Sequence, residues 1–150
     1  MTEPSSETFP GTLVGVERLR EHVRERAKQG GLPAKAVYNL CLAIDEIATN
    51  VVLYGYEKAG RTGSLRIGTS LDEETFTVTL DDEGVAFDPS RFVPPTPEEL
   101  ARRLEDRTIG GLGLFLAFRG VDTLRYDVRS GVNRHTFSVK RQPHGSTPLA

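Results

Sequence analysis

The sequence has a single cysteine, no tryptophan and no large excess of charge of either sign. Because Cys41 has no second cysteine to pair with, the chain cannot form an internal disulfide, which fits a reducing compartment. Cys41 lies among apolar residues at helical spacing, so it is more typical of a core side chain than of a nucleophile. The net charge of −2 lacks the basic excess of a nucleic-acid-binding protein, so we expect no nucleic-acid partner.

Long apolar runs are missing too, since none approaches the roughly 20 residues that cross a bilayer. The first residues, MTEPSSETFPG, are polar and acidic and lack the features of a signal peptide. We therefore expect a cytoplasmic protein without a membrane partner. The hydrophobic fraction of 37% in 150 residues is typical of one globular domain. We expect disorder over 1–7, one domain over 8–141 and a disordered tail over 142–150.

The stretch CLAIDEIATNVVLYGY, residues 41–56, is where we expect the chemistry. Apolar residues recur at helical spacing and predict a helix that starts after Pro33 and ends near 53–55. Glu46 and Asn50 lie four residues apart, which places both side chains on one face, roughly 6 Å apart. The pair could serve as a base and a Mg²⁺ ligand. Polar pairs at this spacing are common on helices, so the pair taken alone is more typical of a polar seam that hydrogen-bonds to a neighbouring element.

The rest of the chain predicts further helices and two hairpins. A helix is expected over about 14–29, stopped by Gly30 and Gly31, with a short strand over 8–14. Alternating apolar and polar residues predict hairpins over 64–71 with 75–80 and over 121–128 with 133–140. We therefore expect an α+β fold, a two-layer sandwich of a mixed, mostly antiparallel sheet with helices on one face.

Two loops could contact a ligand. The acidic segment DDEGVAFDP follows the strand at 75–80, and three glycines at 110–113 precede an apolar helix. Glycines before a helix let backbone N–H groups approach an anion, but taken alone they are more typical of a tight turn and close helix packing. The polar, proline-rich stretch between the two loops, residues 90–108, has the length of a lid.

These segments occur in an order that resembles the Bergerat-fold ATP-binding superfamily, which includes gyrase and the sensor histidine kinases. LAIDEIATNVVLYGY resembles its N box, LDDEGVAFDP its first glycine box and GGLGLFL its second. Within the superfamily, the sequence is most similar to the bacterial anti-sigma-factor serine kinases. The resemblance covers nearly the whole chain, from about 14 to 140, and implies ATP and Mg²⁺ as cofactors.

The resemblance also implies roles for single residues. Glu46 matches the general base, and Asn50 matches the ligand that ties Mg²⁺ to the phosphates. Asp82 matches the aspartate that hydrogen-bonds the adenine amino group, and Thr136 matches the threonine behind the adenine pocket. The remaining nucleotide contacts are Gly84 and Ala86 in the first glycine box, Arg107 in the lid, and Gly110, Gly111 and Gly113 in the second glycine box.

The implied function is an ATP-dependent serine kinase that phosphorylates a STAS-domain antagonist and sequesters a sigma factor, and the resemblance also implies a homodimer. Ala86 replaces a glycine of the first box, and Tyr54 stands where close relatives often have histidine. These departures motivate an alternative, a nucleotide-binding switch that binds a protein partner without phosphorylating it. A detached histidine-kinase ATPase half is disfavoured, because no dimerisation helix with a phosphoacceptor histidine is evident.

Overall fold

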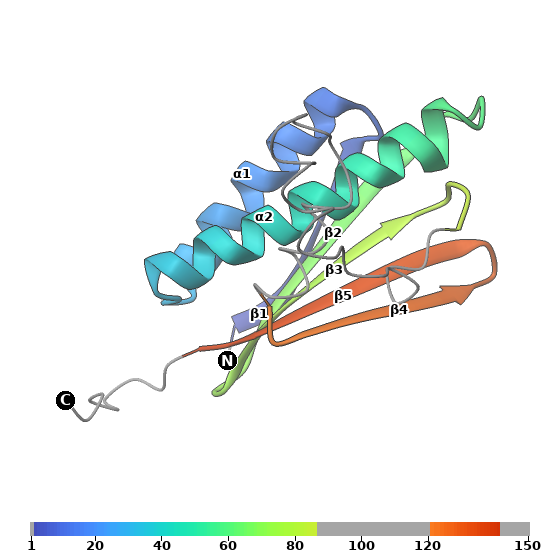
Figure 1. The fold of residues 1–150 in the computed structure, drawn as a ribbon. Helices are drawn as coiled ribbons and strands as arrows, with labels where there is room; N and C mark the ends of the chain where they lie inside the picture. Colours follow the sequence, from blue (N-terminus) through green and yellow to red (C-terminus); the bar gives the residue numbers. More distant parts are fainter. Residues whose placement is uncertain (1, 87–120, 142–150) are drawn as a thin grey trace, which may run out of the picture.

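In the part of the chain that the structure describes, the fold is a sheet with two α-helices on one side of it. The computed structural model describes residues 2–86 and 121–141, with side chains from Ser5 onward. Both helices run side by side over the same face of the sheet (Figure 1). The elements are β1 (Thr2–Pro10), α1 (Leu13–Gln29), α2 (Ala34–Asn50), the π-helical segment η1 (Val51–Glu57), β2 (Ser64–Leu71), β3 (Thr75–Asp82), β4 (Thr123–Arg129) and β5 (Val132–Lys140).

In the described part of the chain, the sheet has five strands in the order β1-β2-β3-β5-β4. All of the described pairings are antiparallel, which confirms the predicted two-layer α+β fold. The β2–β3 turn is closed by Asp72, whose Oδ1 accepts hydrogen bonds from the backbone N–H groups of Glu74 and Thr75 at 2.8 and 2.7 Å. In the β4–β5 turn, Ser130 and Gly131 have positive φ angles of 52° and 80°, as tight hairpin turns require.

The first strand differs from the sequence expectation. A strand was expected over 8–14 and a loose segment over 1–7, whereas β1 runs over Thr2–Pro10 and α1 already begins at Leu13. The segment TEPSSETFP has low intrinsic strand propensity. Pairing with β2 along Ser5–Pro10 supplies the hydrogen bonds that make it a strand. The segment is therefore a strand because it pairs with β2 at the edge of the sheet, and the local sequence pattern does not indicate that pairing.

Helix α1 follows its predicted boundaries closely. The Thr12 Oγ1 atom accepts a hydrogen bond from the Gly15 N–H over 3.1 Å and caps the N-terminus. Val16, Leu19 and Val23 are buried, as their spacing predicted. The helix ends at Gln29, and Gly31 has a φ of 80° just beyond it, a conformation that glycine adopts without strain.

The core lies between α2 and the sheet. Leu40, Ile44 and Ile47 are fully buried on the helix, and Val78 and Phe137 are fully buried on the strands below it. Each such side chain contributes about 1.5–3 kcal/mol through removal from water. The core thereby fixes the rotation of α2, and the rotation decides where Glu46 and Asn50 point.

The continuous helical segment Ala34–Glu57 is long and apolar enough to cross a membrane by length and composition, with a mean hydropathy of 1.4 over its best window. Polar residues such as Asp45, Glu46 and Asn50 interrupt the apolar residues of this segment, so it contains no long uninterrupted apolar run. In the fold, 56% of that window is buried against protein. The core helix of a globular domain meets the same criterion, and its burial here accounts for the apolar composition.

Candidate functional site

Glu46 and Asn50 lie on the last turns of α2, and their side chains share a hydrogen bond. The Asn50 side chain is buried at 8% exposure, and Glu46 is partly buried. Burial and then the charge of Asp45 raise the pKa of Glu46, while the hydrogen bond with Asn50 opposes the rise. Within the described part of the chain, the buried Oε1 atom of Glu46 has no hydrogen-bond partner. A purely structural polar seam would be expected to satisfy that atom.

The helix then widens into the π-helical segment η1, which contacts the loop after β3. The Gly55 carbonyl accepts a hydrogen bond from the Val85 N–H over 3.0 Å. The Tyr56 hydroxyl accepts one from the Glu83 N–H over 2.9 Å and donates one to the Ser64 carbonyl over 2.7 Å. These bonds tie the end of the Glu46–Asn50 helix to the first glycine box. A π-helical turn often marks a functional site.

Asp82 closes β3 and points to the helix side of the sheet. It is buried at 3% exposure. Its Oδ1 atom accepts hydrogen bonds from the Gly84 N–H over 2.8 Å and from Asn133 Nδ2 over 2.9 Å. Its Oδ2 atom is buried and has no hydrogen-bond partner among the described residues. Burial raises the pKa of the Asp82 carboxyl, and the bonds from Asn133 and Gly84 oppose that rise.

The neighbouring aspartate has a different role. Asp81 lies on the opposite face of β3, where Arg134 donates two hydrogen bonds to its carboxylate, from Nε at 2.8 Å and from Nη2 at 2.7 Å. The alternation of side chains along a strand separates the two carboxylates. Of these two carboxylates, that of Asp82 is therefore the one that can contact a ligand on the helix side of the sheet.

Thr136 does not lie beside Asp82 in this structure. It pairs with Thr79 on β3, and the strand alternation places both on the Asp81 face of the sheet. The polar β5 residues on the Asp82 face are Asn133 and His135, which are 2% and 0% exposed. The sequence reasoning missed both, although the alternation around buried Phe137 could have indicated their side of the strand.

The other predicted nucleotide contacts divide into two groups. Gly84 is buried beside Asp82, and Ala86 is exposed at the end of the first described range. The remaining predicted contacts lie outside the described residues: Arg107, Gly110, Gly111 and Gly113. The described site thus brings together Glu46 with Asn50 on α2, and Asp82 with Gly84 after β3, joined by the η1 contacts.

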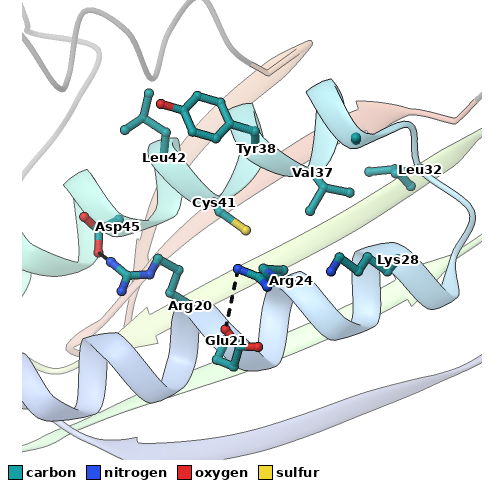
Figure 2. Close-up of a pocket in the computed structure, with 11 residues that line it drawn as sticks. Arg20, Glu21, Arg24, Lys28, Leu32, Val37, Tyr38, Cys41, Leu42 and Asp45 are labelled. Atoms are coloured by element: carbon teal, nitrogen blue, oxygen red, sulfur yellow. Dashed lines mark hydrogen bonds and ion pairs between the residues drawn. The ribbon is translucent and has the colours of Figure 1, made fainter.

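A separate groove runs between α1 and α2 and encloses about 640 Å³ (Figure 2). Along its α1 wall, Arg20 is paired with Asp45 at 2.9 Å, and Arg24 lies 4.0 Å from Glu21. Its lining contains none of the residues predicted to contact the nucleotide. The groove is therefore distinct from the site built around Asp82.

Comparison with known proteins identifies the class to which this fold and site belong. The family described as the histidine kinase-like ATPase domain matches residues 9–138. The chain belongs to this family. It is also 31% identical to a serine-protein kinase RsbW from Halalkalibacterium halodurans, over 88% of this chain and 76% of that protein.

Two further curated relatives have similar names. A serine-protein kinase RsbW from Listeria innocua is 32% identical over 69% of this chain and 63% of its own length. The serine/threonine-protein kinase BtrW from Bordetella bronchiseptica is 28% identical over 82% of both chains. Within the ATPase family, the chain is thus a protein-serine/threonine kinase of the RsbW type, as the sequence resemblance predicted.

Solved structures agree on the fold. The RsbU and RsbW domains of a Mycobacterium tuberculosis protein superpose with a TM-score of 0.62 at 18% identity, over 95% of this chain and 33% of that chain. A chain of the SiaB–SiaC complex from Pseudomonas aeruginosa superposes with a TM-score of 0.54 at 11% identity, over 91% of this chain and 89% of that chain. At these identities the likeness concerns the fold alone, and it confirms the predicted architecture.

Proposed function

We propose that this kinase phosphorylates a serine of a STAS-domain antagonist protein with ATP, and that it also sequesters a sigma factor in the same regulatory switch. The observation that carries the proposal is the pair of buried carboxylate oxygens, Glu46 Oε1 and Asp82 Oδ2, which lack hydrogen-bond partners in the described part of the chain. Buried polar atoms of this kind are costly unless a ligand completes them. The two acceptors lie on the segments that the kinase resemblance assigns to the reaction and to the adenine base.

The polar groups of the site suit a nucleotide. The Asp82 Oδ2 atom is a buried acceptor, which suits the exocyclic amino group of adenine. An amide oxygen such as that of Asn50 suits Mg²⁺, which takes much of its shell from waters and phosphates. When bound, the metal ion would neutralise phosphate charge. Gly84 lets the loop backbone approach Gly55 closely, which keeps Asp82 and Asn50 within one site.

The transfer requires a base and a positioned phosphoryl group. Glu46 would accept the proton of the substrate serine hydroxyl as the serine oxygen forms its bond to the γ-phosphorus. The bond from that phosphorus to the β–γ bridging oxygen breaks, and ADP leaves. Its partly buried position raises the pKa of Glu46, which makes the carboxylate a stronger proton acceptor than an exposed glutamate.

The partners and the compartment belong to the proposal as well. By resemblance, we place the protein in the cytoplasm and expect it to act as a homodimer. The free thiol of buried Cys41, whose pKa is raised by burial, fits a reducing compartment.

The test is phosphotransfer to a purified candidate STAS-domain partner protein. With MgATP and the wild-type chain, the STAS protein should gain one phosphoserine, detected by mass spectrometry. Glu46→Gln should bind the same protein without modifying it. A STAS protein that forms a stable complex with the wild-type chain and gains no phosphate would instead support the nucleotide-dependent binding switch.

A further inference from the structure

We propose that Tyr126 and Asn133 form a relay across β4 and β5 that orients the Asp82 carboxylate and thereby selects adenine over guanine nucleotides. This inference rests on the proposed use of ATP at this site. Neither relay residue was among the sequence-predicted contacts. Tyr126 lies on β4 and Asn133 on β5. The resemblance connected one residue of these strands with the adenine pocket, Thr136, which lies on the other face of the sheet.

The hydrogen bonds determine the orientation of the Asn133 amide. Its Nδ2 atom donates to Asp82 Oδ1 and to the Gly84 carbonyl, both at 2.9 Å. Its Oδ1 atom accepts from the Tyr126 hydroxyl, also at 2.9 Å. A flipped amide would set its carbonyl oxygen against two acceptors. The amide is therefore held in one orientation, with Tyr126 anchoring it from the next strand.

The amide in turn determines which carboxylate oxygen is free. Asp82 Oδ1 receives one bond from Asn133 and one from the Gly84 N–H at 2.8 Å. These donors hold the carboxylate in one rotamer, because rotation would break both bonds. The Oδ2 atom is left as a buried acceptor without a partner among the described residues.

An ionised Asp82 can only accept at Oδ2. Adenine carries an amino group at its 6-position, which donates to such an atom. Guanine carries a carbonyl oxygen there, which would face the carboxylate as a second acceptor. The hydrogen-bond donors to Oδ1 favour the ionised form of Asp82 and so maintain the preference for adenine over guanine. A protonated Asp82 could instead donate to guanine, so loss of the relay should narrow the difference between the two bases.

Several charged and titratable groups surround Asp82 and influence the pH at which its carboxyl loses its proton. Asp81 and Glu83 flank it on its own strand and loop, and their charges raise its pKa along with burial. Tyr56 approaches from η1 through its bond to Glu83, and His135 and Tyr126 lie on the same sheet face with ring centroids 4.9 Å apart. Asn133 donates a side-chain hydrogen bond to the Asp82 carboxylate, which lowers the pKa against the effect of burial.

The experiment measures ATP and GTP affinity by calorimetry from pH 5.5 to 8 for the full chain. Asn133→Leu should weaken ATP binding roughly 10- to 100-fold, the effect of losing a hydrogen bond to a charged group. It should also reduce the ATP/GTP ratio and move the acid loss of ATP binding to higher pH. Tyr126→Phe, a milder change at a half-exposed position, should shift both readouts in the same direction.

Tyr38→Phe is the matched control, because Tyr38 is 68% exposed and lies near the N-terminus of α2, at the end opposite to Asn50. It should leave the base ratio and the pH profile unchanged. A second readout needs no nucleotide: the Asp82 carboxyl carbon, followed by NMR, should titrate at higher pH in Asn133→Leu than in wild type.

The outcomes separate the two proposals. Wild-type binding of ATP, with folded Asn133→Leu and Tyr126→Phe proteins that keep the wild-type base ratio and pH profile, would overturn the relay and leave the kinase proposal standing. A wild-type chain that binds neither nucleotide would overturn both. A wild-type chain that binds ATP and GTP equally well would overturn the role of the relay in base choice.

Discussion

Gly84 lies directly against Gly55, so a Cβ atom on Gly84 would meet the Gly55 carbonyl oxygen at 2.8 Å. The contact joins the loop that follows Asp82 to η1, which continues the helix that carries Asn50. Both sides of it are backbone, which cannot rotate away as a side chain could. The two halves of the site are therefore held together at this point.

Gly84→Ala should lower the free energy of unfolding by about 1–3 kcal/mol, the usual cost of overpacking. It should weaken ATP binding as well, because the shift displaces Asp82. Chemical denaturation and calorimetry measure the two effects. Gly55→Ala is the control, since its Cβ would meet its nearest neighbour at 3.5 Å, an ordinary contact. Equal effects of the two substitutions would contradict this interpretation.

Glu46→Gln should abolish phosphoryl transfer while ATP affinity stays within about twofold of wild type, because an amide cannot accept the serine proton. Single-turnover assays with the STAS-domain substrate measure the transfer. Glu25→Gln is the control. Glu25 lies on the exposed face of α1 and is not among the charges that shift the pKa of Glu46, so its replacement should leave transfer intact. Wild-type transfer rates in Glu46→Gln would remove Glu46 from the reaction.

Tyr56→Phe should destabilise the fold by about 1–3 kcal/mol, because it leaves a backbone donor and a backbone acceptor without their partner. The affected groups are the Glu83 N–H and the Ser64 carbonyl. Thermal or chemical unfolding measures the change. Tyr54→Phe should have little effect, since Tyr54 is 49% exposed. An unfolding free energy of Tyr56→Phe equal to that of wild type would show that the η1 brace contributes nothing.

Asp82→Asn should stabilise the folded chain at neutral pH while it weakens ATP binding. Burial raises the pKa of Asp82 above its ordinary value of 3.8, so the folded chain holds this proton more tightly than the unfolded chain. The stability that this group contributes is fully present below pH 3.8 and is lost as the pH rises through the higher folded-state pKa. Asparagine avoids that loss because it carries no charge.

The difference in unfolding free energy between Asp82→Asn and wild type should therefore be largest near neutral pH and should shrink toward acid pH. Urea titrations at several pH values measure it. A variant that is less stable than wild type at pH 7 would show that the carboxylate is better solvated than the structure indicates.

Much of this fold was accessible to sequence reasoning. The periodicity of 41–56 predicted α2, and the alternation of 64–71 and 75–80 predicted the β2–β3 hairpin. Local patterns suffice where burial repeats at a fixed period. The bounds of strand β1 were not predicted, because its pairing with β2 is a long-range contact between segments more than fifty residues apart in sequence.

The site was accessible in part. Glu46 and Asn50 emerged from helical spacing, and Asp82 from the family resemblance. Asn133 and His135 did not, because the sequence does not show the register of β5 against β3, which brings their part of the strand beside Asp82. The same register explains why Thr136, chosen by resemblance, lies on the other face. Register is set by the packing of the whole sheet.

The most direct test of the account is calorimetric titration of the purified chain with ATP, with and without Mg²⁺. We predict Mg²⁺-dependent binding in the micromolar range, about −8 kcal/mol. The Asp82→Asn variant should bind ATP at least tenfold more weakly, the loss expected for one hydrogen bond to a charged group. Absence of ATP binding by the wild-type chain in both conditions, or equal ATP affinity of the Asp82→Asn variant, would contradict it.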